Sequence, residues 1–173
     1  MYAVTLTLFK NIIFIFPIIF LFVLVFTGFD LTFFFSGINI SFNFIYIIIF
    51  YWILKKPKYL GYGFIFFAGL VNDVVQNYPI GISSINYLLL CAIAAFIRTR
   101  TLLPNLIYDW ILFFLAIIII NSINYSILSL IFNFPIKYAT LMFSSFVTFL
   151  AYPIFSKFFD IIDIINLRNE DAE

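Results

Sequence analysis

Residues 12–26 read IIFIFPIIFLFVLVF, a run that contains no charged and no hydrogen-bonding side chain. Lys10 precedes the run, and the first charged residue after it is Asp30. A helix needs about 20 apolar residues to cross the hydrocarbon core of a membrane, so the run with its flanks predicts a spanning helix over residues 11–29. No cleavage site of small residues follows it, which favours a helix that is not removed as a signal peptide.

The whole chain resembles this run in composition. Of its 173 residues, 65% are hydrophobic and only 10% are charged, and the mean hydropathy is +1.18. Soluble domains carry about 25% charged residues, because so small a domain must cover its core with polar surface. The composition therefore predicts a single integral membrane domain over residues 1–173.

Charged and turn-forming residues divide the chain into further apolar stretches. They predict an all-α polytopic membrane protein with about six transmembrane helices, at approximately residues 11–29, 38–54, 59–76, 82–97, 106–122 and 138–155. The end of the fifth helix stays open within residues 123–136. Residues 156–173 alternate apolar and polar residues at helical spacing. They are interpreted either as a cytoplasmic amphipathic tail, along the interface or on a partner, or as an extension of the sixth helix.

The basic residues predict the orientation of these helices. Cytoplasmic loops of membrane proteins carry an excess of Lys and Arg. If the N-terminus is in the cytoplasm, every basic residue except Lys137 falls on the cytoplasmic side. This bias predicts an even number of crossings, with both termini inside and the segment at residues 77–81 outside.

The residue types present exclude several classes of function. The chain has no histidine, which is the commonest general base and metal ligand. Cys91 is the only cysteine, so neither an internal disulfide nor a multi-cysteine metal site can form. The net charge is +1 and the basic residues are scattered, which gives no basis for nucleic-acid binding. We therefore expect that the chain is not an enzyme and that it has no catalytic residue, no metal ligand and no cofactor.

One set of polar residues lies inside the predicted third helix. Gly69, Asn72, Asp73 and Gln76 are spaced so that they share one helix face, and Asn86 of the next helix can supply a hydrogen-bond partner. A carboxylate inside a membrane is costly and needs a partner. Two interpretations are open: a buried contact that joins the third and fourth helices, or a site where this face meets a partner protein or a ligand.

Between these two helices lies the segment Asn77-Tyr78-Pro79-Ile80-Gly81. Pro79 fixes one backbone dihedral and Gly81 permits a positive φ. A turn with these residues needs little chain to reverse direction. The segment therefore predicts a tight helical hairpin on the outer side.

These residues together resemble the signature region of a known family. Gly69, Asp73, Pro79 and Gly81, at these spacings and followed by the apolar residues 87–90, are similar to the motif of MreD, the rod shape-determining membrane protein. The resemblance extends to the length and to the one-domain membrane architecture. It also implies a fold similar to that of the substrate-binding subunits of energy-coupling transporters.

The resemblance implies a non-enzymatic role in rod cell shape and peptidoglycan synthesis. Proteins of this family lie in the bacterial cytoplasmic (inner) membrane, as multi-pass members of the cell-elongation complex. The implied partners are an MreC-like single-span membrane protein and, through it, the MreB filament and the peptidoglycan synthases, besides the lipid bilayer. No catalytic residue and no cofactor is implied.

A second class of function stays open from the residues alone. A small-molecule-binding membrane subunit of a transporter needs polar and aromatic side chains that converge on an outward cavity. Asn72, Asp73, Gln76, Asn86 and Tyr87 can line one. Further polar residues on the other helices would favour this alternative.

Overall fold

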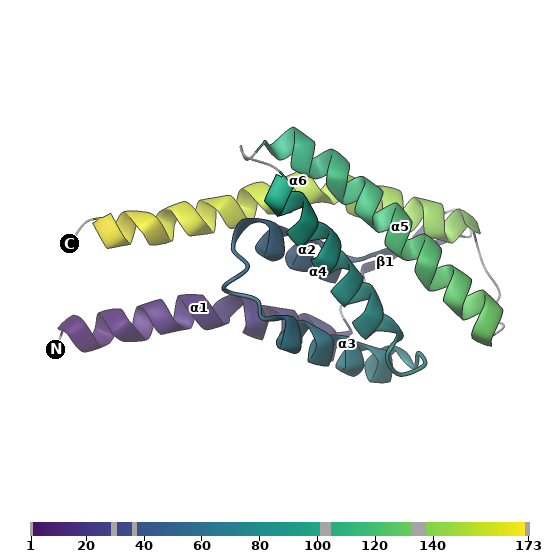
Figure 1. Cartoon of the computed structure of the whole chain (residues 1–173), viewed down its shortest axis with the longest axis horizontal. Helices are drawn as coiled ribbons and strands as arrows, with labels where there is room; N and C mark the ends of the chain where they lie inside the picture. Colours follow the sequence, from purple (N-terminus) through teal and green to yellow (C-terminus); the bar gives the residue numbers. More distant parts are fainter. Residues whose placement is uncertain (1, 29–30, 36–37, 101–104, 133–137, 172–173) are drawn as a thin grey trace.

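The computed structural model describes the backbone of residues 2–28, 31–35, 38–100, 105–132 and 138–171, and the side chains of residues 15–28, 42–100, 105–132 and 140–161. These residues form six helices and one pair of strands (Figure 1). In chain order they are α1 (Tyr2–Thr27), β1 (Leu31–Phe35), β2 (Ile38–Phe42), α2 (Phe44–Lys55), α3 (Tyr62–Gln76), α4 (Ile82–Arg100), α5 (Leu106–Phe132) and α6 (Tyr138–Asp171).

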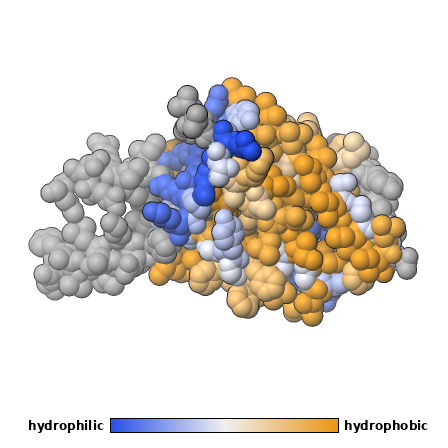
Figure 2. Space-filling view, viewed as in Figure 1, coloured by the Kyte–Doolittle hydropathy of each residue, from blue (hydrophilic) through white to orange (hydrophobic). Residues whose placement is uncertain are grey.

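Three helical segments of the described chain are long and apolar enough to cross a membrane, namely Ile82–Arg100, Leu106–Phe132 and Thr140–Ile161. The apolar helices Phe44–Lys55 and Tyr62–Gln76 are shorter, and Ile15–Thr27 is the part of α1 whose side chains the structure describes. Hydrophobic side chains cover most of the coloured face in Figure 2, and hydrophilic ones gather in a band beside the grey segments. An apolar surface of this extent is far larger than the patches on soluble monomers and suits contact with lipid.

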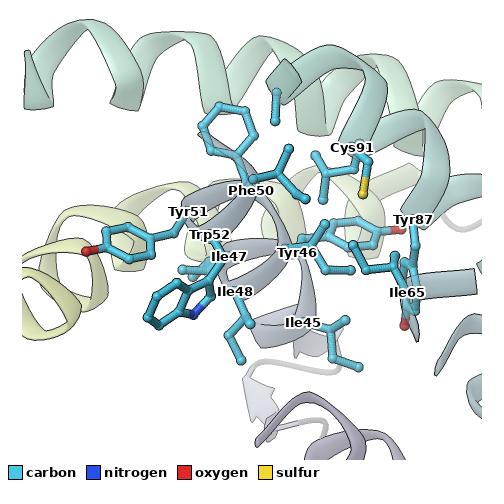
Figure 3. Packing of buried hydrophobic residues seen from close by; sticks show 14 of the residues in the cluster. Ile45, Tyr46, Ile47, Ile48, Phe50, Tyr51, Trp52, Ile65, Tyr87 and Cys91 are labelled. Carbon is cyan, nitrogen blue, oxygen red and sulfur yellow. The ribbon is translucent and has the colours of Figure 1, made fainter. Parts of the chain in front are cut away.

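Helix α2 lies at the centre of the structure. Every residue from Phe44 to Leu54 is buried, and α2 contacts α1, α4 and α6. Bulky aliphatic and aromatic residues occupy all of its faces before Lys55, a pattern found both in protein cores and in helices that contact lipid. In Figure 3 its side chains point in several directions, some of them toward Tyr87 and Cys91 of α4. The other helices therefore enclose α2.

The two strands form an antiparallel hairpin directly before α2. Leu31 is paired with Phe42 at one end and Phe35 with Ile38 at the other, and β2 also contacts α6. Between β2 and α2, the backbone N–H of Asn43 donates a hydrogen bond to Oγ1 of Thr148 at 3.2 Å. This bond ties the start of α2 to the middle of α6.

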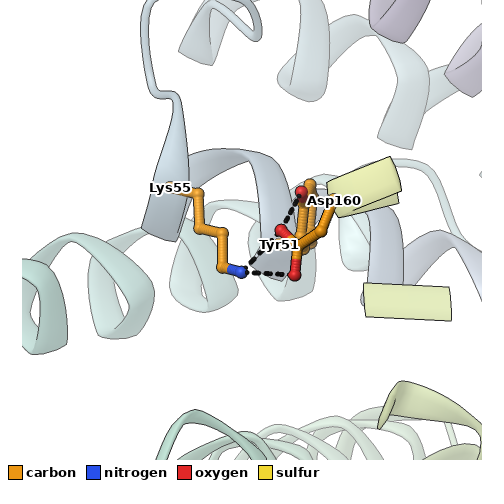
Figure 4. A network of polar contacts seen from close by, with 3 residues as sticks. All are labelled: Tyr51, Lys55 and Asp160. Atoms are coloured by element: carbon orange, nitrogen blue, oxygen red, sulfur yellow. Dashed lines mark hydrogen bonds and ion pairs between the residues drawn. The ribbon is translucent and has the colours of Figure 1, made fainter. Parts of the chain in front are cut away.

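The opposite end of α2 is tied to α6 by charge. Nζ of Lys55 lies 2.7 and 2.9 Å from the carboxylate oxygens of Asp160, and the hydroxyl of Tyr51 donates to the same carboxylate at 2.8 Å (Figure 4). Both charged side chains are partly exposed, so the network closes the bundle at its surface. An exposed ion pair of this kind contributes little energy by itself, roughly 0–1 kcal/mol.

The structure corrects the predicted second helix. The apolar run of residues 38–54 predicts one helix, but residues 38–42 form β2, and α2 begins only at Phe44. The β-branched and aromatic residues of such a run suit a strand as well as a helix, and pairing with β1 decides between them. A helix of 12 residues is about 18 Å long, which is shorter than a ~30 Å hydrocarbon core.

The other helices begin and end close to their predicted bounds, with three differences. The sequence leaves the end of the fifth helix open within residues 123–136. In the structure α5 continues to Phe132, so most of that segment is helical. Residues 156–171 continue α6 without a break, and Ser156 and Phe159 are buried against the bundle. The tail is therefore helical and continuous with the sixth helix as far as Asp171, and whether it lies along the interface or on a partner stays a prediction. The first helix begins at Tyr2, earlier than predicted.

The enclosure of α2 predicts a contrast between two isoleucines. Ile49 is 0% exposed in α2, and Ile119 is 48% exposed on α5. Ile49→Ala leaves a cavity and should destabilise the fold by about 2–4 kcal/mol, whereas Ile119→Ala should have a much smaller effect. Thermal unfolding of the two purified variants in one detergent measures this. Equal losses of stability would show that α2 is not enclosed.

Candidate functional site

The hairpin of α3 and α4 contains most of the residues singled out in the sequence. Helix α3 ends at Gln76, and Asn77 follows it in the left-handed conformation, with φ 56° and ψ 35°. The N–H of Tyr78 then donates to the backbone carbonyl of Asp73 at 2.9 Å. Asparagine adopts this conformation more readily than most residues, so α3 ends here.

The side chain of Asp73 is fully buried and holds the start of α4. One carboxylate oxygen accepts a hydrogen bond from the N–H of Gly81 at 2.7 Å, and the other accepts from the N–H of Ser83 at 2.9 Å. The first N–H groups of a helix have no acceptor within that helix and carry partial positive charge. A carboxylate satisfies both needs, so Asp73 caps α4 from the preceding helix.

Gly69 lets the backbones of α3 and α4 approach closely. A Cβ atom on Gly69 would lie 2.6 Å from the backbone nitrogen of Ser84, which cannot move aside as a flexible side chain can. Beside this contact, Oγ of Ser84 donates to the carbonyl of Phe66 at 2.9 Å, and Nδ2 of Asn72 donates to Oγ of Ser83 at 3.0 Å. Close backbones and polar bonds across the contact are typical of helix pairs in membranes.

Pro79 and Gly81 form the turn itself. Gly81 has φ +102°, the positive value that the sequence predicts, in a region that residues with a side chain rarely adopt. The carbonyl of Pro79 accepts a hydrogen bond from the N–H of Ile82 at 3.4 Å. The chain thereby reverses between α3 and α4 within the segment from Asn77 to Gly81.

This geometry favours the first interpretation of the polar face, a buried contact that joins the third and fourth helices. Gly69 and Asp73 are buried against α4 of the same chain, and Asp73 is 0% exposed. The second interpretation, in which this face meets a partner protein or a ligand, does not hold for Gly69 and Asp73, because their contacts are made within the chain. Gln76 and Asn86 have a different place: together with Asn72 they line a cavity.

That cavity has a volume of about 290 Å³ and lies at the N-terminal end of α2, bounded by the end of α3, the start of α4, the later half of α5 and the start of α6. It is lined by the amides of Asn43, Asn72, Gln76, Asn86, Asn121 and Asn124. Hydroxyl groups complete its polar wall, from Tyr46, Tyr78, Ser83, Tyr87, Tyr125 and Ser144.

Several of the lining residues carry little or no signal in the sequence. Asn121 and Asn124 are three residues apart on α5 and so share a face, and this spacing is the signal that could have found them. Nδ2 of Asn121 donates to Oγ of Ser145 on α6 at 2.7 Å. Asn43 gives no signal, because it lies inside a run whose composition predicts helix throughout.

The cavity offers amides and hydroxyls, which bind by hydrogen bonds. Cys91 lies apart from it, as a buried free thiol in the core. Among the described residues, no group of three or more His, Cys, Asp or Glu is placed to hold a metal ion.

The close contact at Gly69 predicts opposite effects for two glycines of α3. Gly69→Ala drives a methyl group into the backbone of Ser84 and should destabilise the fold by about 1–3 kcal/mol. Gly63→Ala meets nothing within 4 Å and should be neutral or slightly stabilising, because alanine suits a helix better. Thermal unfolding of both variants measures the difference. If both behave alike, α3 and α4 are not in backbone contact.

The two hydrogen bonds to Asp73 predict that a conservative change is harmful. Asp73→Asn keeps one acceptor oxygen and places an NH₂ group against a backbone N–H, so one buried donor loses its partner. The expected cost is about 1–3 kcal/mol, and Asp73→Leu, which removes both acceptors, should cost more. Thermal unfolding at matched expression ranks the three proteins. An asparagine variant as stable as the parent would contradict the cap.

The chain was compared with protein-family models, with curated proteins and with solved structures, and none of them matches it. The resemblance to MreD therefore stays a prediction from Gly69, Asp73, Pro79 and Gly81. Each of these residues has a definite structural role in the α3–α4 hairpin. This hairpin and the cavity beside it are the two features from which a function can be inferred.

Proposed function

We propose that this chain is a non-enzymatic membrane scaffold of the MreD type, which acts in the cell-elongation complex of a rod-shaped bacterium. Under this proposal it is a multi-pass protein of the cytoplasmic (inner) membrane. It supports rod cell shape and peptidoglycan synthesis through an MreC-like single-span protein, and through that protein it reaches the MreB filament and the peptidoglycan synthases.

The observation that carries the proposal is the α3–α4 hairpin. The residues on which the resemblance rests are those that build it: Gly69 at the backbone contact, Asp73 as the cap, and the turn of Pro79 and Gly81. A motif whose members act together in one structural element is unlike a chance spacing of common residues. It provides a rigid pair of helices, as a scaffold requires.

The distribution of charge supports the orientation in the proposal. Lys55 ends α2, and Arg98 and Arg100 end α4, at the end of the bundle away from the α3–α4 turn. In Figure 1 both chain termini lie toward this same side. Cytoplasmic loops are rich in basic residues, so this end is proposed to face the cytoplasm and the turn to face outward.

The second candidate, a small-molecule-binding subunit of a transporter, is favoured by the polar cavity. Its lining includes the further polar residues that this alternative requires, on α5 and α6. A cavity of this size is at the lower end of the range for ligand sites, roughly 300–1,000 Å³. The two candidates predict different losses when the chain is depleted: the rod shape for the scaffold, and uptake of a nutrient for the transporter subunit.

Depletion of the chain in its own rod-shaped host tests the scaffold. We expect the cells to become round, and we expect an affinity-tagged copy to recover a single-span membrane protein with a large extracytoplasmic domain. The two measurements are the cell outline by microscopy and the identity of the co-purified proteins by mass spectrometry.

The control is a tagged multi-pass membrane protein of similar size from the same host, purified in the same detergent. Gly63→Ala should restore the rod shape of depleted cells, because this position has open space around it. Cells that stay rod-shaped after depletion, with loss of uptake of a nutrient instead, would contradict the scaffold and favour the transporter subunit.

A further inference from the structure

Basic residues from two separate segments lie at the end of the bundle away from the α3–α4 turn. Arg98 and Arg100 belong to the last turn of α4, and Nη1 of Arg98 donates a hydrogen bond to the carbonyl of Ile53 in α2 at 3.5 Å. Lys58 follows in the loop from α2 to α3 and is exposed. The packing of α4 against α2 therefore brings Lys58, Arg98 and Arg100, the basic patch, to the same end of the bundle.

The positive charge of the basic patch is not balanced by carboxylates. Among the described residues, no ion pair joins a carboxylate to any member of the patch. Residues 31–72 and 74–108 contain no Asp and no Glu. Of the two carboxylates described at this end, Asp160 is bound by Lys55 and Asp109 is buried. The patch therefore attracts an anion from outside the chain. In Figure 2 hydrophilic side chains gather in a band directly beside the hydrophobic surface.

An exposed apolar face of α4 leads to the basic patch. Ile85 and Phe96 are 50% and 62% exposed, and Ala92 between them is exposed too. Their spacing places them on the same helix face as Arg100. The guanidinium carbon of Arg100 lies 5.3 Å from the centroid of the Phe96 ring, so a positive charge stands where the apolar face ends. A phospholipid has the matching parts, a charged headgroup joined to an acyl chain.

From these observations we propose that the basic patch binds the phosphate of an anionic phospholipid, whose acyl chain lies along α4 from Phe96 to Ile85. Guanidinium groups bind phosphate oxygens by paired, charge-assisted hydrogen bonds, and an ammonium group adds a further positive charge. Clusters of basic residues at the ends of membrane helices recognise anionic headgroups in this way. The proposed scaffold function does not require this lipid, so either proposal can fail without the other.

Basic residues at such a place also have a more general explanation. Lys and Arg in the last turn of a helix stabilise it through the helix dipole, and cytoplasmic loops are rich in them. Neither effect depends on which lipid surrounds the protein. A lipid site, by contrast, makes the stability of the protein depend on anionic lipid, and only through the residues of the patch.

The test uses the purified full chain in nanodiscs of phosphatidylcholine, with and without a minor fraction of phosphatidylglycerol. Near saturation of the site, phosphatidylglycerol should raise the Tm by roughly 3–6 °C. Arg100→Gln and Lys58→Gln should each lose more than half of this increase. Both residues are exposed, so in phosphatidylcholine alone the two variants should unfold at the Tm of the parent. If one variant does not accumulate, the other decides.

Lys157→Gln is the matched control, because it removes an exposed positive charge from α6, outside the patch. This variant should keep the full increase. Glycerol 3-phosphate, which has the phosphate but no acyl chain, should not raise the Tm in phosphatidylcholine. The same Tm with and without phosphatidylglycerol, an increase that either patch variant keeps, an equal loss in Lys157→Gln, or an equal increase with glycerol 3-phosphate would each overturn the proposal.

Discussion

The burial of α2 on every side is the constraint on which the rest of the structure depends. Every residue from Phe44 to Leu54 is covered by protein, and α1, α4 and α6 contact the helix directly. Its two ends are then held by polar bonds, from Asn43 to Thr148 at the start and from Lys55 to Asp160 at the end. Because both bonds reach α6, the central helix also determines where the last helix lies.

The helical positions after residue 59 could be predicted from the sequence, because charged and turn-forming residues divide long apolar runs there. Three of the helical segments are long and apolar enough to cross a membrane. The prediction was wrong at residues 38–42, where apolar residues predicted as helix form β2 and only pairing with β1 distinguishes the two states. The α3–α4 hairpin was predictable because Asp73 and Gly81 act on neighbours in the chain. The cavity was predictable in part: Asn72, Gln76, Asn86 and Tyr87 line it as the transporter alternative expects. Asn43 and Asn124 were not, since they join the lining only through the packing of distant segments.

The hairpin and the cavity share the same pair of helices but use different residues. Asp73 and Gly69 face the contact between α3 and α4 and are satisfied there, whereas Gln76 and Asn86 face the cavity. The tight contact fixes the relative position of the two helices to which these amides belong. A cap that looks purely structural thus also holds part of the cavity wall in place.

The polar bonds of the α3–α4 hairpin and those between α2 and α6 differ in distance along the chain. Those of the α3–α4 hairpin join residues 8 to 18 positions apart, so this unit can close as soon as α4 has been synthesised. Those that join α2 or the residue before it to α6 link residues 105 to 109 positions apart. The central helix is therefore made early and enclosed last. Until α6 is made, Tyr51 and Lys55 lack their shared partner Asp160.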